Sequence, residues 1–170
     1  LGDVYKRQTV MIVGASKMCY YLADELLHMG MSVKIVDQNE TRCAQMSEQL
    51  PRALVIMGDG TDSELLAEEG IADMDAFVAL TGLDETNIIL AMYASQLNHC
   101  KVVAKINRKS FADVVTERGL VDSLVSTGAV TTELIVQYVR AMQNSQATNV
   151  RTLHRLVAVS YTHLRAHETR

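Results

Sequence analysis

A glycine at the end of an apolar run, followed by a small polar residue and a lysine, is the first group in this sequence that could bind a charged ligand. The run Val10-Met11-Ile12-Val13 leads into Gly14-Ala15-Ser16-Lys17. Where such a turn opens a helix, main-chain N–H groups and the helix dipole attract an anion. The Ser16 hydroxyl could donate to a phosphate oxygen, and Lys17 would add a positive charge. The turn therefore predicts a phosphate site.

The spacing of small residues in this turn is that of a weakened dinucleotide fingerprint. In the pattern G-x-G-x-x-G, the first glycine permits the tight turn, the second lets the main chain approach the pyrophosphate, and the third lets helix and strand pack closely. Gly14 holds the first position, whereas Ser16 and Cys19 hold the other two. If residue 16 needs a positive φ, strain of about 1–3 kcal/mol would weaken binding roughly five- to a hundredfold. If φ is negative, Ser16 causes little backbone strain and should weaken nucleotide binding little.

An acidic residue stands where the ribose of a dinucleotide is expected. Asp37 ends the run Val33-Lys34-Ile35-Val36, at about the 20-residue spacing after the first glycine that suits an acid accepting hydrogen bonds from a ribose hydroxyl. A carboxylate there would repel a 2′-phosphate, so NADP is disfavoured. The alternative is an Asp that only caps the following helix. The strand-turn-helix context favours the ligand role.

Further polar groups follow other apolar runs, at positions that share one edge of a parallel sheet. They are Gly58 and Asp59, Thr81 and Gly82, and Lys105 with Asn107. Ligands of open α/β sheets bind beyond the carboxyl ends of the strands, so these groups would gather around a nucleotide lying over Gly14. Each is also ordinary loop chemistry when taken alone. Asp84, Glu85 and Asn87 open a helix and are predicted mainly to cap it.

Short β-branched runs alternate with longer helical patterns along most of the chain, which predicts a parallel sheet with helices on both faces. Strands are predicted at 9–13, 32–37, 53–57, 75–80, 101–106 and 122–125. Helices are predicted at about 17–29, 40–49, 61–69, 84–97, 109–118 and 129–142. Thr61 is expected to cap the third helix, with Glu64 completing a capping box. Right-handed crossovers then give an α/β, doubly wound, Rossmann-like fold.

The two ends of the chain differ in character from the middle. Residues 1–8 and 159–170 resemble translated sequencing or cloning adapter, and such scars are set aside from fold reasoning; the alternative is a basic N-terminal arm and a His/Arg-rich tail. Residues 9–142 are predicted to form the Rossmann-like lobe and 143–149 a polar linker. Residues 150–158 would then start a second, C-terminal lobe that is truncated.

Composition narrows the class of function. The chain has 16 Lys and Arg against 20 Asp and Glu, a formal net charge of −4, which offers no basic footprint for nucleic acid. Its three cysteines are odd in number and far apart, which favours a reducing cytosol. No His, Cys, Asp and Glu residues have metal-ligand spacing, and no Ser/His/Asp set suggests catalysis. We therefore expect no metal, no nucleic-acid partner and no catalytic residue.

A longer series of motifs resembles one known family. The series is Val13-Gly14-Ala15-Ser16, Ile35-Val36-Asp37, Gly58-Asp59-Gly60-Thr61-Asp62, Thr81-Gly82-Leu83-Asp84-Glu85-Thr86-Asn87 and Ala104-Lys105-Ile106-Asn107-Arg108. It resembles the RCK or KTN domain of Trk potassium-uptake regulatory proteins of the TrkA type, over nearly all of residues 9–158. The G-D-G-T-D and T-x-x-D-E-x-N elements are more specific than the glycine turn.

The resemblance implies a cytoplasmic regulatory subunit, peripheral to the inner face of the cell membrane through its partner, a membrane-embedded potassium transporter subunit. It implies that NAD(H) or an adenine nucleotide binds the Rossmann lobe and changes how neighbouring lobes of a homo-oligomer are held. By position, Gly14, Ala15, Ser16, Lys17 and Met18 would face the phosphates and Asp37 the ribose. Thr81 and Gly82 would face the nucleoside region, and Lys105 a nearby phosphate or ribose.

Two further features bear on that family. Helix 129–142 would correspond to its crossover helix, and the departures at Ser16 and Cys19 suit a degenerate second copy of a tandem pair. Helix 84–97 is apolar around most of its circumference, which suits either a subunit interface or burial within one domain.

Two other classes of function fit the same residues. The chain could be the cofactor-binding domain of an NAD-dependent dehydrogenase whose catalytic domain follows, or a structural Rossmann domain that binds nothing. We favour a nucleotide sensor over an enzyme, because the motif series resembles that of a regulatory family.

Overall fold

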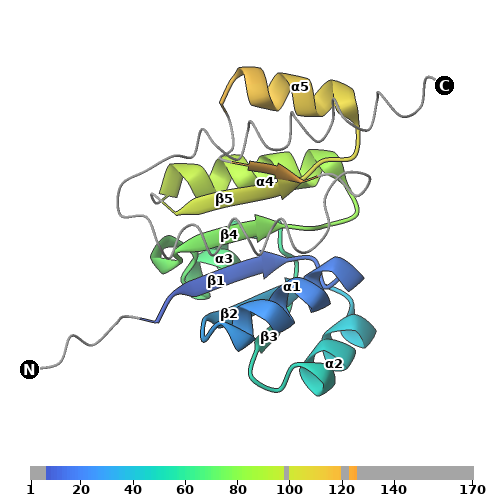
Figure 1. The fold of residues 1–170 in the computed structure, drawn as a ribbon, viewed down its shortest axis with the longest axis vertical. Helices are drawn as coiled ribbons and strands as arrows, with labels where there is room; N and C mark the ends of the chain where they lie inside the picture. The colour runs from blue at the N-terminus through green and yellow to red at the C-terminus, as the bar shows by residue number, and fades with distance from the viewer. Residues whose placement is uncertain (1–6, 98–99, 120–122, 126–170) are drawn as a thin grey trace, which may run out of the picture.

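The computed structural model describes residues 7–97, 100–119 and 123–125, and within them strands and helices alternate (Figure 1). The strands are β1 (Thr9–Val13), β2 (Ser32–Asp37), β3 (Leu54–Met57), β4 (Ala76–Ala79), β5 (Lys101–Lys105) and β6 (Ser123–Val125). The helices are α1 (Lys17–His28), α2 (Glu40–Gln49), α3 (Ser63–Glu68), the short 3₁₀ helix η1 (Ile71–Asp73), α4 (Asp84–Leu97) and α5 (Lys109–Glu117). The predicted helix 129–142 and everything after it lie outside the described residues.

All six strands are parallel, and their spatial order is β3-β2-β1-β4-β5-β6. The chain first builds outward from β1 to β3, then returns to the other side of β1 and builds outward from β4 to β6. Val13 at the end of β1 is therefore paired with Val36 of β2 on one side and Ala79 of β4 on the other. This order confirms the predicted doubly wound, Rossmann-like α/β fold, with its reversal between β1 and β4.

Alternate residues of the strands feed two separate hydrophobic cores, one on each face of the sheet. Val10 and Ile12 of β1 pack with residues of α1 and α2, such as Leu22 and Met46. Met11 and Val13 pack in the second cluster, with α3, η1, α4 and α5. A period of two with both sets buried is what a sheet covered on both faces requires. Sequence patterning and layer order therefore agree.

The start of α3 differs from its prediction. Asp62, not Thr61, is the N-cap, because its Oδ1 accepts a hydrogen bond from the Glu64 main-chain N–H at 2.9 Å. The Thr61 hydroxyl instead donates to Asp59 Oδ1 at 2.7 Å. The capping box predicted from Thr61 and Glu64 is therefore wrong. Either Thr61 or Asp62 could cap α3 by residue type. Because the Thr61 hydroxyl is bonded to Asp59, Asp62 takes the capping position.

Candidate nucleotide-binding site

Gly14 is where the turn after β1 meets the end of β4. Its φ is +106°, and a Cβ built on it would lie 2.7 Å from the Leu80 carbonyl carbon and 2.8 Å from the Thr81 nitrogen. A side chain is therefore excluded both by backbone conformation and by the approach of the neighbouring main chain. The first fingerprint glycine does more than permit a tight turn, since it lets two strand ends touch at the reversal of strand order.

Ser16 occupies the second fingerprint position without backbone strain. Its φ and ψ are −83° and 171°, and its side chain accepts a hydrogen bond from the Cys19 main-chain N–H at 3.2 Å. Ser16 is thus the N-cap of α1, a role that serine fills well. Of the two cases left open by the sequence, the one with negative φ holds. The substitution carries no conformational penalty.

The rest of the turn divides between core and surface. Ala15 is buried, and its N–H donates to an Asp37 carboxylate oxygen, so it is not free for a phosphate. Lys17 is exposed at the start of α1, whereas the side chain of Met18 packs partly against the core on the α1 face. The first N–H groups of a helix have no intrahelical acceptor. Those of Lys17 and Met18 can therefore face an anion, although the Met18 side chain does not.

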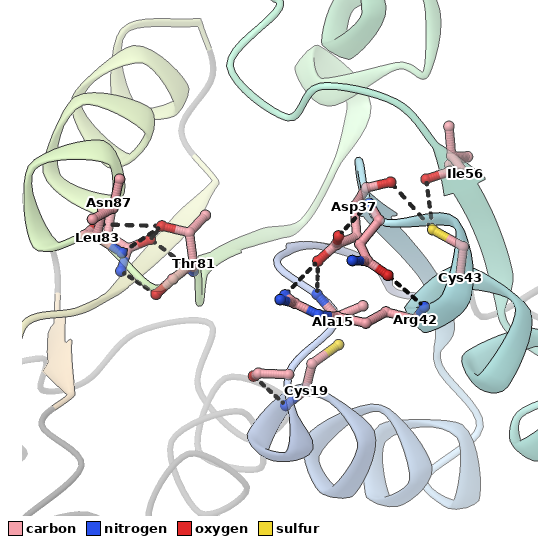
Figure 2. Close-up of polar contacts among 11 residues, drawn as sticks. Ala15, Cys19, Asp37, Arg42, Cys43, Ile56, Thr81, Leu83 and Asn87 are labelled. Carbon is pink, nitrogen blue, oxygen red and sulfur yellow. Dashed lines mark hydrogen bonds and ion pairs between the residues drawn. The ribbon is translucent and has the colours of Figure 1, made fainter.

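Asp37 is only 7% exposed and its carboxylate ties three segments together (Figure 2). Oδ2 accepts from the Ala15 N–H at 2.7 Å and Oδ1 from the Asn39 N–H at 2.8 Å. The Arg42 Nη1 lies 3.6 Å from Oδ2. Each carboxylate oxygen has two lone pairs, so acceptor capacity remains for a ribose hydroxyl. The ribose role of Asp37 stays a prediction, and the sequence analysis missed that Asp37 also holds the glycine turn.

Cys19 and Cys43 are two buried thiols close to Asp37. Cys43 Sγ donates to the Asp37 carbonyl oxygen at 3.2 Å. Burial, and secondly the charge of Asp37, raises the pKa of Cys19 to about 12, and the same two causes raise the pKa of Cys43 against an opposing main-chain hydrogen bond. Both thiols therefore stay protonated at neutral pH. They fill space beside the turn and are not poised as nucleophiles.

The Gly58-Asp59-Gly60 element next to Asp37 is a packing turn. Added Cβ atoms would meet Leu65 Cδ2 at 2.4 Å from Gly58 and Val13 Cγ1 at 2.3 Å from Gly60. The Gly58 N–H donates to the Asp37 carbonyl, which places the turn beside the predicted ribose site. Asp59 accepts from the main-chain N–H and the hydroxyl of Thr61, and these bonds lower its pKa. The Asp59 carboxylate is therefore committed to its own turn.

On the other side of the reversal, Asn87 joins two strand ends, and Figure 2 shows its contacts with Thr81. Its Oδ1 accepts from the Thr81 N–H at 2.8 Å and from the Thr81 hydroxyl at 2.7 Å. Its Nδ2 donates to the carbonyls of Thr81 at 3.2 Å and Lys105 at 2.8 Å. Thr81 and Lys105 are thus brought together as predicted, with Gly82 exposed beside Thr81. The part played by Asn87 was missed, although the T-x-x-D-E-x-N spacing marks it.

Asp84 performs a similar task for the next loop. Its two carboxylate oxygens accept from the N–H groups of Asn107 at 3.0 Å and Arg108 at 2.8 Å. Burial alone would raise the pKa of Asp84, but these bonds and the Arg108 guanidinium lower it overall. Arg108 also pairs with Glu85. The prediction that Asp84 and Asn87 mainly cap their own helix is therefore wrong, because their bonds go to the loops after β4 and β5.

Lys105 is a nearly buried cation at the end of β5. It is 8% exposed, and burial lowers its pKa while the charge of Asp84 opposes the shift. Among the described residues its ammonium has no hydrogen-bond acceptor, although its carbonyl is held by Asn87. Such a cation is unfavourable unless it meets an anion. It suits the predicted contact with a phosphate or ribose.

Comparison with known proteins identifies the family. The TrkA-N domain model matches residues 10–127. The chain belongs to the TrkA-N domain family. A Trk system potassium uptake protein TrkA from Vibrio alginolyticus is 37% identical over 155 residues, which cover 91% of this chain and 32% of that protein. The chain thus spans about a third of the length of the curated relatives that it matches.

Solved structures similar to this TrkA-N domain share its fold at low sequence identity. The TrkA-N domain of the Escherichia coli inner membrane protein ybaL has a TM-score of 0.64 and 14% identity, covering 85% of this chain and 100% of that one. The GsuK channel bound to NAD has a TM-score of 0.60 and 21% identity, covering 74% of this chain and 22% of that one. At these identities the likeness establishes fold alone.

The surface of this TrkA-N domain retains large apolar side chains along and near α4. Leu83, Ile89 and Leu97 are 64%, 66% and 43% exposed, while Leu90, Ala91 and Ala94 on the same helix are buried. Within the described ranges, no helix has the length and apolar character needed to cross a membrane, and no three His, Cys, Asp or Glu side chains are grouped to hold a metal ion. The apolar helix predicted at 84–97 is therefore only partly buried within the domain.

Proposed function

We propose that this chain is the nucleotide-binding regulatory domain of a Trk-type potassium uptake system. NAD(H) or an adenine nucleotide binds at the carboxyl edge of the sheet, and its occupancy alters the action of the domain on a membrane-embedded potassium transporter subunit. The observation that carries the proposal is the contact of Gly14 with Leu80 and Thr81 at the reversal of strand order. Dinucleotides bind open α/β sheets at this point.

Each side of the reversal contributes a different part of the ligand site. The N–H groups and charge at the start of α1, with Lys17 and the Ser16 hydroxyl, face the pyrophosphate. The free lone pairs of Asp37 accept from the adenine ribose. Thr81 and Gly82 face the second nucleoside, and Lys105 supplies a cation that the fold leaves without an acceptor among the described residues. Gly58 and Asp59 shape the edge beside Asp37 without contacting the ligand through side chains.

A regulatory role suits the chemistry of the edge better than catalysis. The buried acids Asp37 and Asp84 are both held by main-chain N–H groups. For Asp84, despite burial, these bonds and the Arg108 guanidinium lower the pKa of the carboxyl, which opposes its use as a proton carrier. The relatives that cover most of this chain are named as Trk potassium uptake proteins. We therefore infer a sensor and not a dehydrogenase domain.

Regulation requires that the nucleotide bind one assembly state better than another. The exposed apolar residues Leu83, Ile89 and Leu97 give α4 a surface on which a second copy of the domain can pack. Nucleotide bound at the Thr81 turn, which precedes the same helix, would bias that packing. The domain thus acts as a cytoplasmic homo-oligomer at the inner face of the membrane, attached through its transporter partner.

Titration of NAD+, NADH, ATP and ADP into the chain by calorimetry tests this function. We expect saturable binding of at least one of them, and Lys105→Met should weaken it at least tenfold because a charge-assisted contact is lost. Lys101→Met is the matched control, since Lys101 begins the same strand at the opposite edge of the sheet. Lack of binding by all four at millimolar concentration would contradict the proposal. Equal effects of the two lysine substitutions on affinity would mean that the ligand does not contact Lys105.

A further inference from the structure

Asn87 is completely buried and uses its whole amide within the fold. It is 0% exposed, and its oxygen accepts two hydrogen bonds from Thr81 while its nitrogen donates to the carbonyls of Thr81 and Lys105. An amide has two donor hydrogens and an oxygen with two lone pairs. All four are therefore satisfied by two residues, both of which stand at the carboxyl edge of the sheet.

These contacts lie on one side of the strand-order reversal only. Thr81 follows β4 and Lys105 ends β5, whereas Asp37, Ala15 and Arg42 form the separate group at the ends of β1 and β2. Figure 2 shows the two groups as distinct networks with no drawn contact between them. A dinucleotide lying across the reversal would meet both groups. A mononucleotide held by the Asp37 ribose contact and the α1 N-terminus would meet only the Asp37 group.

We propose that Asn87 is a positioning residue that makes this site prefer a dinucleotide over a mononucleotide. It does so by fixing the Thr81 turn relative to the end of β5, so that the Thr81 turn and Lys105 present one preformed surface to the second half of the ligand. The inference rests on the proposed nucleotide-binding function and assigns a selectivity to that same site.

The chemistry of the amide explains why no other side chain serves equally well. Aspartate keeps the shape and can still accept from the Thr81 N–H and hydroxyl, but it offers no donor to the two carbonyls. A carboxylate facing carbonyl oxygens repels them, and a buried carbonyl without a donor is unfavourable. The loop after β4 and the end of β5 would then separate. The Asp37 group should be unaffected, because the hydrogen bonds of Asp37 and those of Asn87 go to different residues.

The test compares NADH with ADP, which is the part of NADH that the Asp37 side would hold. In Asn87→Asp we expect the dissociation constant for NADH to rise on the order of tenfold, while that for ADP changes less than about twofold. Asn39→Asp is the matched control, because Asn39 caps α2 beside Asp37 and an aspartate can cap equally well. That control should leave the ratio of the two dissociation constants unchanged.

A spectroscopic readout separates positioning from general loss of stability. Nicotinamide emission of bound NADH reports the surroundings of the second half of the ligand. Its change on binding should be present in the wild type and in Asn39→Asp but reduced in Asn87→Asp, measured where thermal melting shows all three proteins folded. Should Asn87→Asp fail to fold, Thr81→Val removes one of the same hydrogen bonds, and Thr81→Ser should restore the NADH preference.

Equal losses of NADH and ADP affinity, or no loss of either, in a folded Asn87→Asp protein would overturn the inference while leaving the proposed function intact. A wild type that binds neither NADH nor ADP would overturn this inference, and lack of binding by all four nucleotides would overturn the proposed function as well.

Discussion

The carboxylate of Asp37 accepts a hydrogen bond from the main-chain N–H of Ala15 at 2.7 Å, so the acid expected to bind ribose also fixes the turn expected to bind phosphate. The two halves of the proposed nucleotide site are thereby joined by a hydrogen bond within the fold. Preorganisation of this kind lowers the entropy lost on binding. It also means that a substitution of Asp37 acts on the fold as well as on the ligand.

Asp37→Ala should therefore lower both stability and nucleotide affinity. It leaves the buried N–H of Ala15 without its acceptor, which costs about 1–3 kcal/mol of the free energy of unfolding. Urea denaturation measures this loss. Asp113→Ala, an exposed position on α5, is the control and should change stability by less than about 0.5 kcal/mol. Equal stability of the Asp37→Ala and Asp113→Ala proteins would show that Asp37 does not hold the turn.

Gly14 and Gly30 allow conformational strain to be separated from steric exclusion. Both have positive φ, +106° and +84°, but a Cβ at Gly14 would meet the main chain of Leu80 and Thr81, whereas nothing lies within 4 Å at Gly30. Gly30→Ala should lose about 1 kcal/mol from the left-handed conformation alone. Gly14→Ala should lose a further 1–3 kcal/mol, roughly, from overpacking. Similar unfolding free energies for the two variants would refute the contact between the ends of β1 and β4.

Restoring glycine at the second fingerprint position should not strengthen nucleotide binding through relief of strain. Ser16 has φ of −83° and caps α1, so Ser16→Gly relieves nothing and removes the hydrogen bond to the Cys19 N–H. We expect stability to fall by a few tenths of a kcal/mol, against about 1 kcal/mol for Ser16→Ala. Calorimetric titration of NADH into both variants checks the affinity. A gain of fivefold or more in Ser16→Gly would mean that the serine side chain obstructs the ligand.

The strand order and both core faces of this domain could be predicted because they follow from hydrophobic periodicity and from the handedness of crossovers. Candidate residues at strand ends could be predicted for the same reason, since the carboxyl ends of parallel strands share an edge. Gly14, Asp37, Thr81 and Lys105 were found in this way, and the structure places them at that edge.

The hydrogen-bond partners at that edge could not be predicted. Asp84 reaches the Asn107 and Arg108 N–H groups, and Asn87 reaches the Lys105 carbonyl, only because β5 lies next to β4. Helix-capping rules consider only residues that are neighbours in sequence, so they do not predict such contacts. The φ of Ser16 was likewise undetermined, because G-x-G-x-x-G states which residues fit without stating which backbone conformation is adopted.

The buried thiol of Cys19 should make stability fall at high pH. Burial, and then the charge of Asp37, raises its pKa from 9.0 to about 12. The stabilisation is complete below about pH 9 and is lost as the pH rises toward 12, because the unfolded chain releases the proton first. Cys19→Ala removes this dependence. At pH 10.5 the wild type should have lost roughly 2 kcal/mol relative to the variant, compared with pH 8. Urea denaturation of both proteins at the two pH values measures this loss. An equal change in the free energy of unfolding of the two proteins between pH 8 and pH 10.5 would contradict the burial of the thiol.

Lys105 should lower the stability of the ligand-free protein, because its ammonium is placed to bind an anionic ligand. Its ammonium is nearly buried and has no hydrogen-bond acceptor among the described residues, and burial lowers its pKa below 10.5. Lys105→Met keeps the apolar stem and removes the charge, so the ligand-free variant should be as stable as the wild type or more stable by about 1 kcal/mol. Because the unfolded lysine binds its proton more tightly, wild-type stability rises with pH toward 10.5 and the advantage of the variant shrinks.

Thermal melting with and without nucleotide distinguishes a ligand-binding role of Lys105 from a purely structural one. The Lys105→Met protein without ligand should melt no lower than the wild type but should gain less from NADH, since the stabilisation by a ligand rises with its affinity. Lys101→Met, at the opposite end of β5, should keep the full ligand-induced shift. A ligand-free Lys105→Met protein that melts well below the wild type would show that the Lys105 ammonium has a stabilising partner within the fold. The end of β5 would then not be expected to bind an anion.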